Sequence, residues 1–344
     1  MIPPVVEPTG VELVGKVTGQ DSPNRTGSRF GFLATDLGVL WDDGAGGVLA
    51  AFGDTYGEGW TGPGAGARSA DHRRNVVARC AGGPLTGGLE LASVVEDQPG
   101  HAAEILPGRR WLARLRMEST VIPTAGIAVD GVQYLHYMSV RRWGRPGSWR
   151  TNHGGIAWSA DGGATWRTGR GARWRNPWWT RGRRPFQLGA FARSPDGSVV
   201  YLFGTRNGRF GPVYLARVDP GAVASPSRYE YWTGQGWVSG VKAARPVTDG
   251  PAGELSVAFH HGLGVWLMVH LDDPGGRIAL RAADRPTGPW SDGVTLLSGA
   301  EHPGLYGGYL HPGALHGSDI YFTVSRWDPY NVYLARAGLL LKAH

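Results

Sequence analysis

The chain has one cysteine, Cys80, so no disulfide can form within it. It lacks an apolar run of about 18 residues, the minimum for a membrane-spanning helix. Its first residues, MIPPVVEPTG, lack the charged and apolar regions of a signal peptide. HExxH, paired CxxC and P-loop patterns are also missing, and these carry the common zinc and nucleotide sites. We therefore expect no membrane span and no required cofactor; a cation bound in a central channel stays open but is not predicted.

Glycine, proline and tryptophan are abundant instead, with 56 Gly, 24 Pro and 15 Trp in 344 residues. Gly and Pro in such numbers indicate many tight turns between short strands. The formal net charge is +7, but the basic residues follow no nucleic-acid-binding motif, so no nucleic-acid partner is predicted. Arginine with tryptophan suits a glycan surface better, because indole faces stack on sugar rings and guanidinium groups bond hydroxyls.

A unit of strand, turn, strand and strand occurs five times, and no helical period extends over a useful length. The similarity of the units is clear from the sequence VYLAR, which starts at Val213 and again at Val332. The repeat predicts an all-β fold, a five-bladed β-propeller forming one domain over residues 1–344. The second strands are VLAAFGDT, VQYLHYMSV, VVYLFGT, VWLMVHLDD and DIYFTVSRW, and the blades lie near residues 30–80, 117–168, 186–220, 253–293 and 306–340.

An Asp-box pattern, S-x-D-x-G-x-T-W, occurs as SADGGATW from Ser159 to Trp166. We interpret it as an outer hairpin turn with the tryptophan packed beneath it. Asp161 is then structural, because an aspartate in such a turn bonds backbone amides.

Candidate functional residues follow from propeller geometry. The first strand of each blade starts at the face to which the second strand returns, so residues at these points surround one channel mouth. The starts of the first strands hold Asp36, Glu118, Gln187, Glu254 and Tyr309 with His311, and the ends of the second strands hold Asp54, Ser139, Thr205, Asp272, Asp273 and, just beyond, Asp328.

Several carboxylates at one mouth repel one another, and this repulsion raises the pKa of one of them. A glycosidase uses such a shift to keep one carboxyl protonated beside an ionised one. Asp36 and Asp54 form the sharpest pair, because they lie on adjacent strands of one blade and have flanking glycines in TDLG and FGDTYG. Which is the acid, and whether the configuration is retained or inverted, stays open. Structural alternatives also stay open: Asp54 could cap a turn, and Glu254 and Glu118 could pair with arginines.

Aromatic residues gather in WRNPWWTRGRRP, between the second and third units. Trp178 and Trp179 in this loop could form a stacking platform for a glycan or cover the gap between blades.

Several separated motifs resemble one known family. They are ATDLGVLWDDG, AFGDTYG, YLFGTRNGRFGPVYLARV, GELSVAF, TGPWS, LYGGYLHP and WDPYNVYLA, and the resemblance spans about Gly27 to Leu340. The chain is similar to an actinobacterial propeller family, first catalogued as a domain of unknown function and now associated with the endo-D-arabinanases of glycoside hydrolase family 183.

This resemblance implies hydrolysis of α-linked D-arabinofuranose chains, as in mycobacterial arabinogalactan and lipoarabinomannan. It implies that Asp36 and Asp54 carry the reaction and that Glu254 and Gln187 support it or bind substrate. From the substrate class we expect an extracellular or cell-envelope location, although no signal peptide is visible. Oligomeric state is left open.

Three other functions remain in competition. The Asp-box favours a sialidase-like hydrolase, but no arginine triad for the substrate carboxylate stands out. Another furanosidase is closer, because a fold does not fix its substrate. A non-catalytic glycan-binding propeller would suit the aromatic loop, but it would tolerate Asn at positions 36 and 54, whereas a hydrolase would lose turnover.

Overall fold

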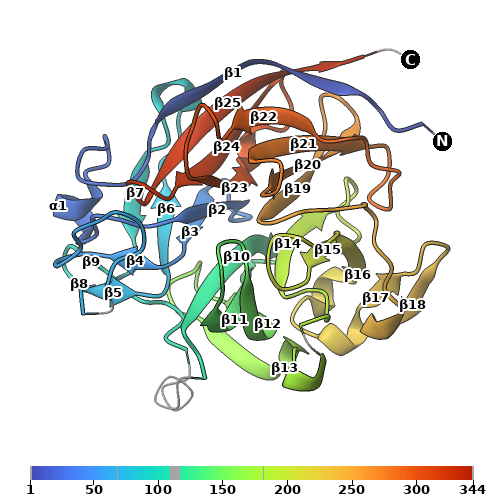
Figure 1. Ribbon diagram of the computed structural model, residues 1–344, viewed down its shortest axis with the longest axis horizontal. Coiled ribbons are helices and arrows are strands. Elements are labelled where there is room, and N and C mark those ends of the chain that lie inside the picture. Colours follow the sequence, from blue (N-terminus) through green and yellow to red (C-terminus); the bar gives the residue numbers. More distant parts are fainter. Residues whose placement is uncertain (1, 68, 109–116, 181, 343–344) are drawn as a thin grey trace.

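The computed structural model describes residues 2–67, 69–108, 117–180 and 182–342. Five small antiparallel sheets stand in a ring (Figure 1), which confirms the predicted fold class, a five-bladed β-propeller. The innermost strands contact one another in succession: β2 (Leu37–Asp42), β10 (Thr120–Val129), β14 (Leu188–Arg193), β19 (Leu255–His260) and β23 (Leu305–Leu310). Because β23 also contacts β2, the ring is closed.

Each of the first four sheets runs outward in chain order, and beyond the three strands of the sequence repeat the third sheet carries two outer strands and the others carry one. These outer strands are short or exposed on one face, so their apolar pattern is weak. The strands after the innermost one are β3 (Val48–Phe52), β6 (Val76–Cys80) and β7 (Leu91–Val94); β11 (Val132–Trp143), β12 (Trp149–Ser159) and β13 (Arg167–Arg175); β15 (Val200–Thr205), β16 (Tyr214–Val218), β17 (Glu230–Trp232) and β18 (Trp237–Ser239); and β20 (Val265–Asp272), β21 (Arg277–Ala283) and β22 (Val294–Ser298).

The fifth sheet is built from both ends of the chain. After β23 come β24 (Asp319–Arg326) and β25 (Asn331–Leu341), and the outer strand is β1 (Val6–Lys16). β1 pairs antiparallel with β25 over its whole length, and the two lie together at the top of Figure 1. This pairing joins the first strand to the last.

Minor elements decorate the ring. Two short strand pairs, β4 with β5 and β8 with β9, and the helix α1 lie beside the first sheet. Among the described residues, no helix has the length and apolar character needed to cross a membrane. The remaining bounds are α1 (Thr26–Phe30), β4 (Thr55–Tyr56), β5 (His72–Arg73), β8 (Glu96–Gln98), β9 (His101–Ala102) and six 3₁₀ turns at Leu85–Gly87, Trp178–Thr180, Pro220–Ala222, Pro226–Arg228, Val241–Ala243 and Pro312–Ala314.

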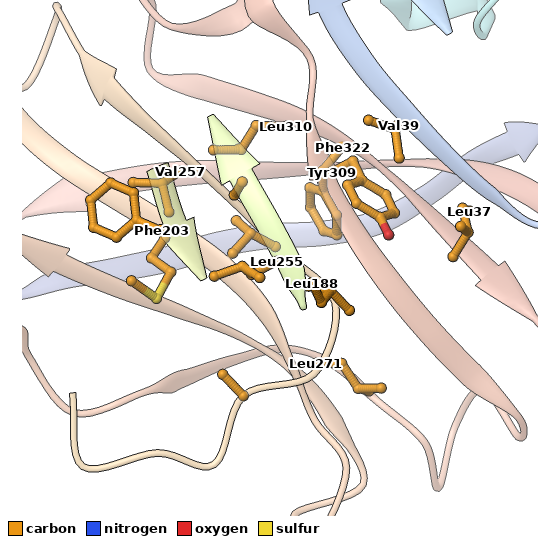
Figure 2. Close-up of a cluster of buried hydrophobic side chains, with 14 of the residues drawn as sticks. Leu37, Val39, Leu188, Phe203, Leu255, Val257, Leu271, Tyr309, Leu310 and Phe322 are labelled. Carbon is orange, nitrogen blue, oxygen red and sulfur yellow. The ribbon is translucent and has the colours of Figure 1, made fainter. Parts of the chain in front are cut away.

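The core lies where the innermost strands converge. Leu37 from β2, Leu188 from β14, Leu255 from β19 and Tyr309 from β23 pack together, as Figure 2 shows. Each is at most 4% exposed, so burial of apolar area from four blades holds the ring together.

The Asp-box residue has the structural role that the sequence predicts. In the turn between β12 and β13, Asp161 accepts hydrogen bonds from Ser159 Oγ at 2.6 Å and from the Thr165 amide at 2.9 Å. These bonds hold the pKa of the Asp161 carboxyl below its usual value. Trp166 Nε1 donates to the Gly163 carbonyl at 2.9 Å and closes the turn.

Candidate active site

A cavity of about 630 Å³ opens at the face where first strands begin and second strands end. All five blades contribute to its wall, and it brings together four of the predicted residues: Asp36, Asp54, Glu254 and Asp273. Asp36 directly precedes β2, Asp54 follows β3 by two residues, and Glu254 directly precedes β19. Asp273 directly follows β20. Four carboxyl groups therefore share one funnel, because strands of the first and fourth blades start and end there.

Asp36 is the carboxyl whose protonation is most altered. Tyr306 donates its hydroxyl to Asp36 Oδ2 at 3.1 Å, whereas Oδ1 is buried without a hydrogen-bond partner among the described residues. Burial, followed by the negative charge of Asp54, raises the pKa of Asp36 to about 8; Tyr330 and Tyr306 partly oppose this by favouring the ionised form. The Asp36 carboxyl is therefore mostly protonated at neutral pH, the state that a general acid requires.

Gly53 makes room for this carboxyl. A Cβ at position 53 would lie 2.3 Å from Asp36 Oδ1, closer than any real contact. The glycine of the FGDT motif therefore allows the Asp36 carboxyl to lie directly against the neighbouring strand end.

Asp54 is held by two donors on one oxygen. His72 Nε2 lies 3.0 Å from Asp54 Oδ1, and Thr120 Oγ1 donates to the same atom at 2.5 Å. Tyr56 stacks on the His72 ring with 4.8 Å between centroids, which fixes the imidazole. Among the described residues no donor bonds the second oxygen, Oδ2, so that oxygen is available to a bound water or substrate.

Glu254 is paired with Arg209. Arg209 Nη2 and Nε donate to Glu254 Oε1 at 2.7 and 3.2 Å, and Nη1 donates to Asp273 Oδ1 at 3.1 Å. Glu254 Oε2 is buried without a partner among the described residues. The arginine therefore balances two carboxylates of the cavity wall.

Gln187 and Glu118 lie at the predicted strand starts but do not line this cavity. Gln187 is fully buried and accepts from Thr151 Oγ1 at 2.6 Å while donating to the Trp174 carbonyl at 3.0 Å. Glu118 is 3% exposed and accepts from Ser139 Oγ at 2.5 Å. Both side chains make their hydrogen bonds inside the protein, so neither lies at the channel mouth, where the sequence predicts them.

The fifth blade differs most from the expected placement. Its first strand begins at Leu305, so Tyr306 takes the place at the mouth that the sequence assigned to Tyr309. Tyr309 lies deeper and is 2% exposed. His311 follows the end of β23, at the opposite face, where burial lowers its pKa to about 4.

Asp328 and the two tryptophans also lie outside the cavity. Asp328 is exposed, whereas its neighbours Trp327 and Tyr330 line the cavity. Trp178 and Trp179 are 74% and 66% exposed, and Trp178 lines a different pocket.

The sequence did not indicate His72, Thr120, Arg209 or Tyr306. His72 comes from a two-residue strand and Arg209 from the loop after β15, and neither position follows from the repeat. The one available signal was a second tyrosine, Tyr306, three residues before Tyr309, the strand start that the sequence predicts. Within the described residues, no group of three or more His, Cys, Asp or Glu side chains could hold a metal ion.

Comparisons with known proteins agree on the fold and the family. Residues 21–336 match the family described as Domain of unknown function (DUF4185). The notoamide biosynthesis cluster protein J of Aspergillus sp. (strain MF297-2) is 31% identical over 327 residues, covering 91% of this chain and 84% of that protein. Of solved structures, a putative hydrolase from Bacteroides ovatus is 14% identical with a TM-score of 0.59, covering 91% of this chain and 87% of the other. The α-L-arabinofuranosidase of Podospora anserina is 12% identical with a TM-score of 0.49, covering 95% of both chains.

Proposed function

We propose that this chain, which belongs to the DUF4185 family, is a glycoside hydrolase that cleaves internal α-D-arabinofuranosyl linkages of D-arabinan. The observation that carries the proposal is the Asp36–Asp54 pair, in which one carboxyl has a raised pKa and the other is fixed through one oxygen. The Aspergillus relative takes its name from a notoamide biosynthesis cluster, so family membership alone does not assign a glycan substrate.

In the proposed reaction the protonated Asp36 is the general acid. It gives its proton to the glycosidic oxygen as the bond from that oxygen to the anomeric carbon breaks. Asp54 presents Oδ2, either to deprotonate the attacking water or to bond the anomeric carbon directly. His72 and Thr120 hold Oδ1, so the ionised carboxylate keeps one orientation throughout.

The cavity wall suits a neutral sugar chain. Trp143 and Trp327 line it and are 46% and 53% exposed, and open aromatic faces of this kind stack on sugar rings. The carboxylate of Asp273, which also lines the cavity, supplies a partly exposed acceptor for a sugar hydroxyl. Two arginines line the described part of the wall, and Arg209 is engaged by Glu254 and Asp273, so Arg145 alone is left where a sialidase needs an arginine cluster. This argues against the sialidase alternative.

The test is product analysis after incubation with mycobacterial arabinogalactan. The parent should release arabino-oligosaccharides, and Asp36→Asn and Asp54→Asn should each reduce turnover by about 10²–10⁴-fold. Asp130→Asn, an exposed change at a positive-φ turn that Asn also tolerates, is the matched control and should keep the parental rate.

Each half of the proposal has its own refutation. No product from a folded parent would remove D-arabinan as the substrate, and L-arabinan would be tried next. Product release by Asp36→Asn at the parental rate would remove Asp36 from the mechanism. Retained glycan binding by both Asn variants, with no turnover by the parent on any furanan, would favour a binding propeller.

A further inference from the structure

A second pocket, of about 380 Å³, shares the β11–β12 hairpin with the carboxylate cavity. Trp143 and Trp149 are cross-strand partners in this hairpin and line the carboxylate cavity. The next pair, Arg142 and Arg150, lines the second pocket. Because successive side chains of a strand point to opposite faces, the hairpin separates the two spaces.

A break in the strand register gathers a third arginine there. Val140 pairs with Thr151 and Arg142 pairs with Arg150, so Arg141 is an extra residue opposite no partner. Such a bulge re-aims a side chain. Arg141 and Arg142 consequently line the same pocket, although consecutive residues of a regular strand would face opposite ways.

This arrangement of charge is unfavourable in the protein alone. Like charges directly opposite each other on a strand pair destabilise it. The three arginines are exposed, and none forms an ion pair with a carboxylate within the described part of the chain. None of the described lining residues is acidic. A bound anion would supply the missing opposite charge.

The pocket also has a polar floor and an aromatic edge. Thr151 is 3% exposed and accepts from Asn176 Nδ2 at 3.0 Å. Its hydroxyl lies 2.8 Å from Asn207 Oδ1, which leaves the Nδ2 group of Asn207 as a further donor without an acceptor among the residues described. Trp178 lines the pocket and is 74% exposed, so its indole face is open to a sugar ring.

We propose that this pocket, formed by Arg141, Arg142, Arg150, Asn207 and Trp178, binds an anionic group carried by a glycan, a carboxylate or a phosphate. Guanidinium forks bind both anions, and the tryptophan binds the sugar that bears them. A nucleic acid fits less well, because the basic residues form one pocket rather than a track and the adjoining cavity holds four carboxyl groups. The site is independent of the proposed hydrolysis, since it concerns binding alone.

The test is calorimetric binding at low ionic strength, where charge interactions are least screened. The probes are trigalacturonate, its methyl ester, which keeps the shape without the charge, and inorganic phosphate. The variant is the triple change Arg141→Gln, Arg142→Gln and Arg150→Gln. The control is Arg228→Gln, Arg245→Gln and Arg285→Gln, which removes the same charge from exposed arginines outside the pocket. Circular dichroism checks that both variants are folded.

We expect the parent to bind trigalacturonate at least about tenfold more tightly than the ester or phosphate, and the pocket variant to lose about tenfold. The control should stay within about twofold of the parent. Equal affinity for acid and ester, or equal losses in the two variants, would overturn the site. Phosphate binding as tight as trigalacturonate, or tighter binding of a thymidine oligonucleotide, would overturn the glycan assignment.

Discussion

Replacement of Asp36 by asparagine should make the protein more stable above neutral pH while removing its proposed activity. The Asp36 carboxyl has its pKa raised from 3.8 to about 8, so between these values the folded state holds a proton that the unfolded state has released. Stability of the parent therefore falls as the pH rises through this window. Asparagine has no proton to lose, and Asp36→Asn is free of that penalty.

The size of the effect follows from the shift. About four pKa units at 1.36 kcal/mol each give about 6 kcal/mol over the whole window. This is an upper limit, because burial is the largest cause of the shift and any water that enters the cavity relieves it. Between about pH 5 and pH 8 the parent should lose about 4 kcal/mol of stability that Asp36→Asn keeps.

The assay is urea unfolding of the parent, Asp36→Asn and Asp130→Asn at about pH 5, 7 and 9. The free energy of unfolding of Asp36→Asn, relative to the parent, should rise with pH and level off above about pH 8. Asp130 is exposed, so its replacement should give a difference that changes little with pH. If the free energies of unfolding of Asp36→Asn and the parent differ by the same amount at pH 5 and pH 9, the raised pKa is refuted and, with it, the role of Asp36 as the acid.

Two further substitutions test the contacts of the cavity. Gly53→Ala places a methyl group 2.3 Å from Asp36 Oδ1, so we expect the activity to fall by about 10²-fold with the protein still folded, whereas Gly82→Ala, which meets no atom within 4 Å, should match the parent in the same assay. If Gly53→Ala keeps full activity, the position of the Asp36 carboxyl is not important to the reaction. Arg209→Met leaves Glu254 without its cation and should cost about 3–5 kcal/mol in urea unfolding. Arg336→Met removes an arginine that also bridges two carboxylates, Glu12 and Asp319, but at the surface, and should cost less than about 1 kcal/mol; equal costs would contradict the importance of burial.

The parts of the fold that could be predicted are those set by short stretches of sequence. Apolar alternation and turn residues recur in every blade, so the five sheets and the mouth positions of Asp36, Asp54 and Glu254 follow from the repeat. The strand β1 has no counterpart in the repeat, because it is the outer strand of a sheet whose other strands lie at the far end of the chain. Its pairing is visible only in three dimensions.

The residues that contact the site carboxyl groups could not be predicted from the sequence for a related reason. His72 and Thr120 meet at Asp54 only when two blades are in place, and Arg209 reaches Glu254 from the neighbouring blade. In the fifth blade, the run LYGGYLHP contains two tyrosines and offers two possible strand starts. The register shift between Gly307 and Tyr309 decides between them, and such a bulge depends on the neighbouring strand.

The pairing of β1 with β25 imposes an order on the assembly of the ring during synthesis. β1 leaves the ribosome before every blade, yet its partner strand follows the last of them. Until β25 arrives, β1 has an unpaired backbone edge and the fifth sheet cannot be completed. Every sheet except the fifth can form from contiguous sequence, whereas β1 can join β25 only after all five blades have been synthesised. Proteolytic cleavage that removes β1 or β25 would break the same strand pairing.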